Sequence, residues 1–140
     1  MVTPVQKTLV QNTFASIVPI ADDAAALFYR RLFEIDPSLQ AMFRGDMKEQ
    51  RRKLMQMIGA AVKGLDRLEQ LVPVVQDLGR RHAGYGVEDR HYDTVGEALL
   101  WTLEMGLGAA FTPDVKEAWA TVYGLLATTM QHAAREPVAV

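Results

Sequence analysis

The sequence contains no cysteine among its 140 residues, which excludes disulfide bonds, zinc sites built on thiolates and catalysis by a cysteine nucleophile. Because disulfides form in oxidising compartments, their absence favours a reducing compartment, and we expect the protein in the cytoplasm.

Long apolar runs are also missing. The residues from Met1 to Lys7 lack the apolar core of a signal peptide, and no later stretch is apolar enough to cross a bilayer. The sequence therefore predicts neither secretion nor insertion into a membrane.

Neither sign of charge dominates the sequence. Lysine and arginine together number 15, aspartate and glutamate 17, and the formal net charge is -2. Such a chain has no broad positive field for a phosphate backbone, so we expect no nucleic acid partner.

Hydrophobic residues make up 49% of the sequence, which is enough for one domain with a sizeable core over residues 1–140. Residues from about 135 to 140, which include Pro137, are expected to form a frayed C-terminal tail.

Alternating apolar and polar runs bounded by hairpin turns, which indicate strands, are absent, whereas helical periodicity extends nearly throughout the sequence. We therefore predict an all-α fold. Thr3-Pro4 and Thr112-Pro113 each pair a capping residue with a proline at the first helical position, and Arg44-Gly45-Asp46 is typical of a turn. Gly84 and Gly86 are expected to end the helix before them. The predicted helices cover residues 3–18, 22–35, 47–64, 71–82, 90–107 and 112–132.

One of the three histidines, His82, continues an apolar stripe along its helix. Residues three and four apart lie on one helical face, and His82 therefore points inward. An inward imidazole either finds a hydrogen-bond partner in the core or binds a metal through a ring nitrogen. Spacing alone leaves both interpretations open, and a core histidine is the commoner of the two. The apolar members of the stripe are Leu71, Val74, Val75 and Leu78.

Tyr29 and Gln50 also interrupt apolar helical faces. Each has a structural explanation, because Tyr29 could bury its ring and bond a carbonyl, and Gln50 lies near an exposed helix start. Together with His82 they would suit a buried planar cofactor with histidine on its metal and hydrogen-bond donors on the other face, which is the arrangement around haem. The remaining histidines, His91 and His132, lie near helix ends and are expected to be structural or exposed to solvent.

Several short motifs are spread along essentially the whole chain. They are Phe28-Tyr29 with Phe33, Asp36-Pro37 before Ala41-Met42-Phe43, Gln50 with Leu54, Arg81-His82, His91-Tyr92 with Val95-Gly96-Glu97, and Ala118-Trp119 with Val122-Tyr123-Gly124. In this combination the sequence resembles the bacterial single-domain globins and is similar to the globin domain of the flavohaemoglobins. The resemblance implies a globin fold of about six to eight helices around a pocket for haem b.

The resemblance also implies roles for individual residues. His82 would be the iron ligand, and Phe43 would pack against the haem plane. Tyr29 and Gln50 would face a diatomic gas such as O2, NO or CO at a five-coordinate ferrous iron, and Leu54 would line the same side. The remaining cofactor contacts that the resemblance implies are Leu78, Val87, Tyr92 and Lys53. Lys53 would lie near a haem propionate, although a solvated lysine explains it equally well.

The sequence departs from the flavohaemoglobins at two points. Those proteins place a glutamate of the last helix beside the ligating histidine, together with the tyrosine that corresponds to Tyr92. Here the position is Ala134, and Glu136 is two residues away, which weakens a peroxidase-like interpretation. The flavohaemoglobins also continue into a reductase, which this sequence does not contain. We therefore expect any re-reduction to come from a separate reductase.

Three functions remain compatible with the sequence. The first is a monomeric haem protein that binds or transports O2, with Tyr29 and Gln50 as hydrogen-bond donors. The second is a nitric oxide dioxygenase that uses the same two residues for nitric oxide detoxification and takes electrons from a separate reductase. The third is a gas sensor or a haem-free interaction module with a globin-like fold. An apo module has no need to keep Tyr29, Gln50 and His82 together, which argues against the haem-free module, and gas binding is favoured over dioxygenation.

Overall fold

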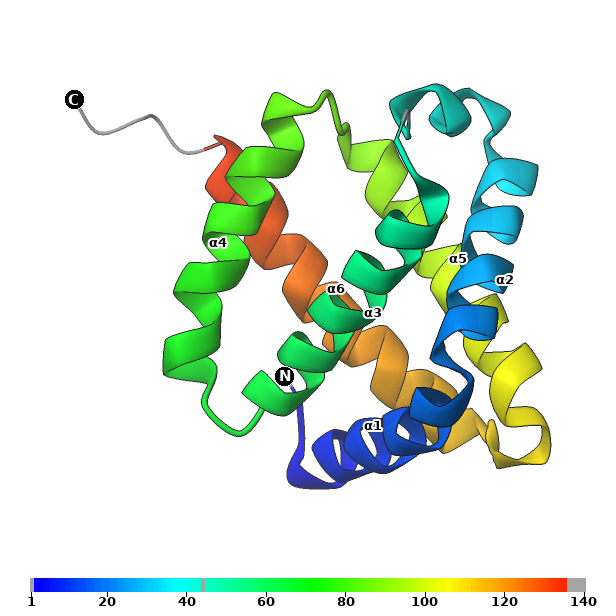
Figure 1. Cartoon of the computed structure of the whole chain (residues 1–140). Helices are drawn as coiled ribbons and strands as arrows, with labels where there is room; N and C mark the ends of the chain where they lie inside the picture. The colour runs from blue at the N-terminus through cyan, green and yellow to red at the C-terminus, as the bar shows by residue number, and fades with distance from the viewer. Residues whose placement is uncertain (1, 44, 136–140) are drawn as a thin grey trace.

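The computed structural model describes residues 2–43 and 45–135, and all regular structure in these residues is helical (Figure 1). The prediction of an all-α fold is therefore confirmed. Arg44 of the predicted turn and the predicted tail at 136–140 lie outside the described residues. The six α-helices are α1 (Pro4–Ile17), α2 (Ala21–Ile35), α3 (Met47–Gly64), α4 (Leu68–Gly84), α5 (Asp89–Leu107) and α6 (Pro113–Arg135), with 3-10 helices η1 (Val18–Ile20), η2 (Pro37–Met42) and η3 (Gly108–Ala110) between them.

Short polar side chains begin several of these helices, as the sequence predicts. The Thr3 hydroxyl accepts a hydrogen bond from the backbone N–H of Gln6 and forms a capping box that starts α1. The Asp46 carboxylate accepts from the backbone N–H of Lys48 at the start of α3. At the other end of a helix, α4 stops at Gly84, and Gly86 follows with a φ of 89°, a left-handed conformation that glycine adopts without strain. The predicted helix boundaries are confirmed at these places.

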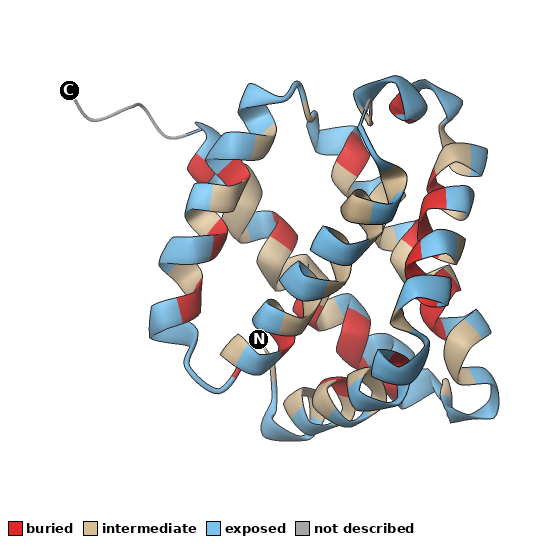
Figure 2. Ribbon diagram, in the orientation of Figure 1, coloured by how far each residue is buried: buried red, intermediate tan, exposed pale blue. Residues whose placement is uncertain are grey.

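The helices pack mainly in two pairs, α4 against α6 and α2 against α5, and α1 lies across α6. One cluster of buried side chains surrounds Trp119 on α6 and joins it to α1 and α5. A second cluster surrounds Phe28, Tyr29 and Leu32 on α2. Buried positions follow the inward faces of α2 and α6, whereas much of α4 is exposed (Figure 2). Helix α4 contacts α3 only slightly, so its position depends chiefly on α6.

A glycine allows the close approach of α4 to α6. Gly79 is buried, and a Cβ atom at this position would lie only 2.6 Å from the Cα atom of Met130 on α6. Any larger residue would therefore push the two helices apart.

Within the described residues, no helix is both long and apolar enough to span a membrane.

Candidate functional site

A cavity of about 380 Å³ lies between α2, α3, α4, α5 and α6. Its size falls within the range of about 300 to 1,000 Å³ that is usual for small-molecule and cofactor sites. Most of the residues on its wall are apolar, which suits a large planar ligand. The structure brings every predicted cofactor and gas-binding residue onto this wall, namely Tyr29, Phe43, Gln50, Lys53, Leu54, Leu78, His82, Val87 and Tyr92.

Helix α4 contributes His82 to the cavity wall. The apolar residues that precede it on the same face, Leu71, Val74, Val75 and Leu78, line the cavity as well, so the predicted stripe is confirmed. Val74 nevertheless keeps 61% of its surface exposed, because it lies at the edge of the cavity rather than in the core.

One ring nitrogen of His82 is held by its own helix. Nδ1 lies 2.8 Å from the backbone carbonyl oxygen of Leu78, and a carbonyl only accepts, so Nδ1 carries the proton and donates it. Burial lowers the pKa of His82 below its ordinary value of 6.5. The hydrogen bond to the Leu78 carbonyl raises this pKa, but by less than burial lowers it, and the charge of Arg81 lowers it further. The imidazole is therefore neutral near pH 7, and the lone pair of Nε2 is available to bind a metal.

Helix α2 contributes Tyr29, whose ring is packed among three phenylalanines. The ring centroid of Tyr29 lies 5.2 Å from that of Phe28 and 5.3 Å from that of Phe43, both in edge-to-face arrangements. Phe33 lies at 6.0 Å on a third side. Such aromatic contacts fix the orientation of the Tyr29 ring, and only 5% of the residue is exposed.

The side chain of Gln50 on α3 lies beside the hydroxyl of Tyr29 and lowers the pKa of Tyr29. Burial has the larger effect and raises the pKa above its ordinary value of 10.0, so the phenol keeps its proton at neutral pH. Tyr29 and Gln50 are thus two neighbouring potential donors on the wall of the cavity.

Lys53 and Leu54 follow Gln50 by about one turn of α3, and both line the cavity. Leu54 is half-buried, whereas Lys53 is exposed. Among residues 2–43 and 45–135, no carboxylate forms an ion pair with Lys53. Its ammonium group is therefore available to an anionic group at the rim of the cavity.

Tyr92, on α5, lines the cavity near the start of its helix. Burial and the nearby Asp89 carboxylate raise its pKa. Its backbone carbonyl accepts a 2.5 Å hydrogen bond from the hydroxyl of Tyr123 on α6. Within the described residues the Tyr92 hydroxyl makes no hydrogen bond to His82, whose Nδ1 is bonded to Leu78 instead.

One cavity residue, His91, was not predicted to be part of the site. Of its two expected roles, structural or exposed to solvent, the structural one is confirmed, because His91 caps α5 and only 5% of it is exposed; it also lies on the cavity wall. Its Nδ1 accepts a hydrogen bond from the backbone N–H of Glu88 at 2.9 Å and caps α5. His132 is exposed, as expected.

Val95 and Leu99 also line the cavity, and they follow Tyr92 at helical spacing. This spacing was the signal in the sequence that could have identified them.

The chemistry of the wall fits haem better than a bare metal ion. No group of three or more histidine, cysteine, aspartate or glutamate residues in the described part of the chain could hold an ion by itself. A metal at His82 would therefore have to bring other ligands with it, as the iron of haem does in its porphyrin. An extended apolar wall, one neutral imidazole and an exposed lysine at the rim match the faces and the propionates of that cofactor.

Comparisons with known proteins agree with this fit. The family model described as Globin matches residues 26–130. A neuroglobin of Danio rerio is 33% identical over 138 residues, which cover 89% of this chain and 87% of the neuroglobin. The flavohemoprotein of Bacillus subtilis is 32% identical over 122 residues, which cover 85% of this chain but 31% of the flavohemoprotein. The chain thus spans about a third of the length of that relative.

Solved structures show the same fold. A bacterial globin from Campylobacter jejuni superimposes with a TM-score of 0.82 at 25% identity, covering 95% of this chain and 96% of that one. The engineered carbene transferase RmaNOD from Rhodothermus marinus gives a TM-score of 0.84 at 24% identity, covering 96% of this chain and 94% of that one. The chain therefore belongs to the globin family, and its cofactor is haem b.

Proposed function

We propose that this globin binds O2 and other diatomic gases, NO and CO among them, at a haem b iron held by His82. Tyr29 and Gln50 donate hydrogen bonds to the gas. The observation that carries the proposal is that Tyr29 and Gln50, two potential donors, lie on the wall of the same cavity as a neutral histidine. A haem-free module would have no use for this combination of residues.

His82 holds the cofactor through Nε2. When bound, haem supplies a ferrous iron that takes a diatomic ligand at the coordination position left open by the protein. The hydrogen bond from Nδ1 to the Leu78 carbonyl fixes the tautomer and the orientation of the ring, as outer partners of metal-ligating histidines do. His91 also lines the cavity, but its Nδ1 accepts from the backbone of Glu88. The histidines of the site therefore favour a five-coordinate iron.

Tyr29 and Gln50 select for ligands that become negatively charged. An O–H or N–H donor stabilises charge that develops on the gas, and such charge-assisted bonds contribute about 1.5 to 3 kcal/mol each. Since burial raises the pKa of Tyr29, the phenol retains the proton that it donates. The aromatic contacts of Tyr29 with Phe28, Phe33 and Phe43 hold the hydroxyl in place before the gas arrives.

The other predicted residues surround the cofactor itself. Phe43, Leu54, Leu78, Val87 and Tyr92 pack against the porphyrin and keep water away from the iron. The exposed Lys53 at the rim pairs with a propionate, where its charge stays hydrated. These assignments divide the wall into a proximal side on α4 and α5 and a gas-binding side on α2 and α3.

The rate of O2 dissociation tests the proposal. The reduced holoprotein is equilibrated with O2, and release is followed optically by stopped-flow mixing with excess CO. Tyr29→Phe is expected to accelerate release, whereas Tyr85→Phe, at an exposed tyrosine outside the cavity, is expected to leave it unchanged. An equal rate in the wild type and in Tyr29→Phe would contradict the proposed donor role.

Nitric oxide dioxygenation is a second candidate, favoured by the same pair of donors and by the similarity to part of a flavohemoprotein. One NO, one O2 and one electron together give one nitrate ion, so sustained turnover needs a one-electron donor such as a separate reductase. The test is to mix reduced, O2-saturated holoprotein with NO and to measure nitrate. One nitrate per haem supports this function, and recovery of nitrite without nitrate rules it out.

A further inference from the structure

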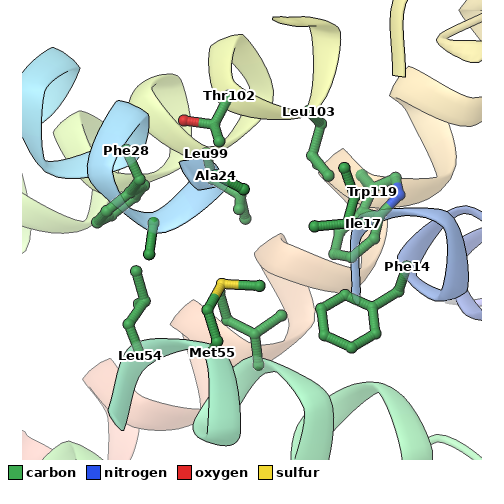
Figure 3. A pocket seen from close by; sticks show the side chains of 12 residues that line it. Phe14, Ile17, Ala24, Phe28, Leu54, Met55, Leu99, Thr102, Leu103 and Trp119 are labelled. Atoms are coloured by element: carbon green, nitrogen blue, oxygen red, sulfur yellow. The ribbon is translucent and has the colours of Figure 1, made fainter. Parts of the chain in front are cut away.

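The main cavity is closed at its inner end by packed apolar side chains. Phe28, Leu54, Ile58, Leu99 and Trp119 line both the main cavity and a smaller one of about 20 Å³. In Figure 3, side chains from several helices converge on this smaller cavity. A cofactor as large as haem cannot pass through such packing without displacing the core, so it enters and leaves the main cavity elsewhere.

Two short segments on the wall of the main cavity lie at the same end of the molecule, namely the end of η2 and the start of α5 (Figure 1). Helix η2 ends at Met42, which is exposed, and both Met42 and the following Phe43 line the cavity. Val87 lies on the wall just before α5, and its backbone N–H donates to the carbonyl oxygen of His82 at 3.1 Å. The spacing between these two segments therefore decides how closely the protein surrounds the cofactor.

An arginine links the two segments. Helix η2 packs chiefly against α2, so helix packing does little to fix it against α5. The guanidinium of Arg90, on α5, contacts both segments, because Nη1 lies 3.3 Å from Oδ2 of Asp36 and Nη2 lies 3.1 Å from Oε2 of Glu88. We call Arg90 together with these two carboxylates the clasp.

Both carboxylates of the clasp belong to residues at which a helix begins. Oδ1 of Asp36 accepts hydrogen bonds from the backbone N–H of Ser38 at 3.1 Å and from its hydroxyl at 2.5 Å, which fixes the start of η2 and leaves Oδ2 to Arg90. The backbone N–H of Glu88 donates to Nδ1 of His91, which fixes the start of α5. Arg90 thus joins two capped helix starts, so that one contact restrains whole segments rather than single side chains.

The Asp36 end of the clasp is shielded from solvent. Its side chain is 19% exposed, whereas those of Arg90 and Glu88 are each 62% exposed. The Ser38 hydroxyl chiefly, and the charge of Arg90 in addition, hold the pKa of Asp36 below its ordinary value, so the carboxylate is charged at neutral pH. Because salt screens shielded pairs less than exposed ones, we expect the Asp36 contact to be the stronger of the two.

We propose that Arg90 is a positioning residue for the cofactor, because the clasp holds the segment that carries Phe43 against the start of α5, which carries Tyr92, and thereby slows the loss of haem. This inference rests on the haem site of the proposed function and is independent of which gas binds there. Opening of the clasp frees η2 to move away from α5, and the cavity then widens at the end where the cofactor leaves.

The rate of haem loss tests the proposal. Ferric holoprotein with one haem per chain is mixed with excess apomyoglobin, which captures released haem, and the transfer is followed by absorbance. Arg90→Met removes the charge and should accelerate the loss about two- to fivefold, the range for one surface ion pair. Asp36→Asn should also accelerate it, because asparagine still caps a helix start and only the charge is lost. Arg30→Met is the matched control, since Arg30 is 66% exposed, pairs with Glu34 and lies outside the cavity wall.

Three further measurements separate the clasp from a general loss of stability. In Arg90→Met/Asp36→Asn, haem should be lost no faster than in Arg90→Met alone, since both changes remove the same contact. In 1 M NaCl the wild type should lose haem about as fast as Arg90→Met, while the rate of the variant stays unchanged. Arg90→Lys keeps the charge and should restore part of the wild-type rate.

Three results would overturn the proposal. They are equal rates of haem loss in the wild type and in Arg90→Met, strictly additive effects of Arg90→Met and Asp36→Asn, and a rate in Arg90→Met that depends on salt as much as the wild-type rate does. The dissociation of O2 from Tyr29→Phe tests the gas-binding role separately. If that test fails, the clasp is unaffected, so the proposed function and this inference can fail independently.

Discussion

The imidazole of His82 donates its Nδ1 proton to the backbone carbonyl of Leu78, one turn earlier on α4, across 2.8 Å. The acceptor is a neutral carbonyl rather than a carboxylate. A carboxylate would increase the basicity of the imidazole and push electron density toward the metal, which favours cleavage of the O–O bond. The arrangement in this protein instead favours reversible binding of the gas.

Replacing His82 by alanine should remove most of the bound haem, because the bond to iron and the apolar wall act together. His132→Ala changes an exposed histidine near the end of α6 and should retain the cofactor. Haem content per chain, measured by a pyridine haemochrome assay after purification, compares the two. Full haem content in His82→Ala would reject the ligand assignment.

Tyr92→Phe should leave the bond between His82 and the iron unchanged, because the structure gives Nδ1 a carbonyl partner on its own helix. The iron–histidine stretching frequency of the reduced protein, measured by resonance Raman spectroscopy, reports on this bond. A lower frequency in Tyr92→Phe would mean that the tyrosine hydroxyl contributes to the hydrogen bonding of His82 after all.

Tyr29→Phe should accelerate O2 dissociation by about ten- to a hundredfold, which corresponds to the loss of one charge-assisted hydrogen bond. Gln50→Leu should have a smaller effect, because an amide N–H is a less acidic donor than a phenol O–H. The effects of the two changes should not add, since the two side chains are neighbours on the cavity wall, and the deviation should exceed about 0.5 kcal/mol. Strictly additive rates in the double mutant would indicate two independent donors.

Gly79→Ala should reduce the free energy of unfolding by about 1 to 3 kcal/mol, a typical cost of overpacking. Its Cβ would come within 2.6 Å of the Met130 Cα atom, where α4 meets α6. Gly84→Ala is the control, since a Cβ at that position meets nothing within 4 Å, and its effect should stay below about 1 kcal/mol. Urea unfolding of both variants measures the difference. Equal stabilities would show that α4 and α6 can separate at little cost.

The stability of the apoprotein should fall as the pH is lowered through 6.5, the ordinary pKa of histidine. Burial lowers the pKa of His82 in the folded state, so the unfolded chain takes up a proton first and gains stability relative to the folded one. The contribution of His82 is therefore present above 6.5 and is lost as the pH falls toward its folded pKa. Urea unfolding on both sides of this pH should show a smaller loss for His82→Gln than for His132→Gln.

The helices and the face of His82 could be predicted because local signals agreed with the tertiary structure. Thr3-Pro4 starts α1 with a complete capping box, and Gly84 ends α4 as expected. The stripe that ends at His82 lines the cavity because helical spacing is the same whether the neighbour is a helix or a cofactor. The roles of Tyr29 and Gln50 came from the resemblance to a family, since each has an ordinary structural explanation by itself.

Features that depend on how side chains pack could not be predicted. The position of His91 near a helix start left a structural and an exposed side chain open, and the structure shows the first, with a capping bond to Glu88. Tyr29 and Gln50 come together from two helices, and this proximity leaves no periodic signal in the sequence.

The dependence of α4 on α6 has a consequence for the protein before it acquires its cofactor. Helix α4 contacts α3 only slightly, and the main cavity lies where side chains would otherwise fill the core. Haem thus completes the hydrophobic core, and without it α4 keeps chiefly its contact with α6. Cofactor supply and local unfolding of α4 are then thermodynamically linked. We therefore expect proteases to cleave α4 more readily in the apoprotein than in the holoprotein.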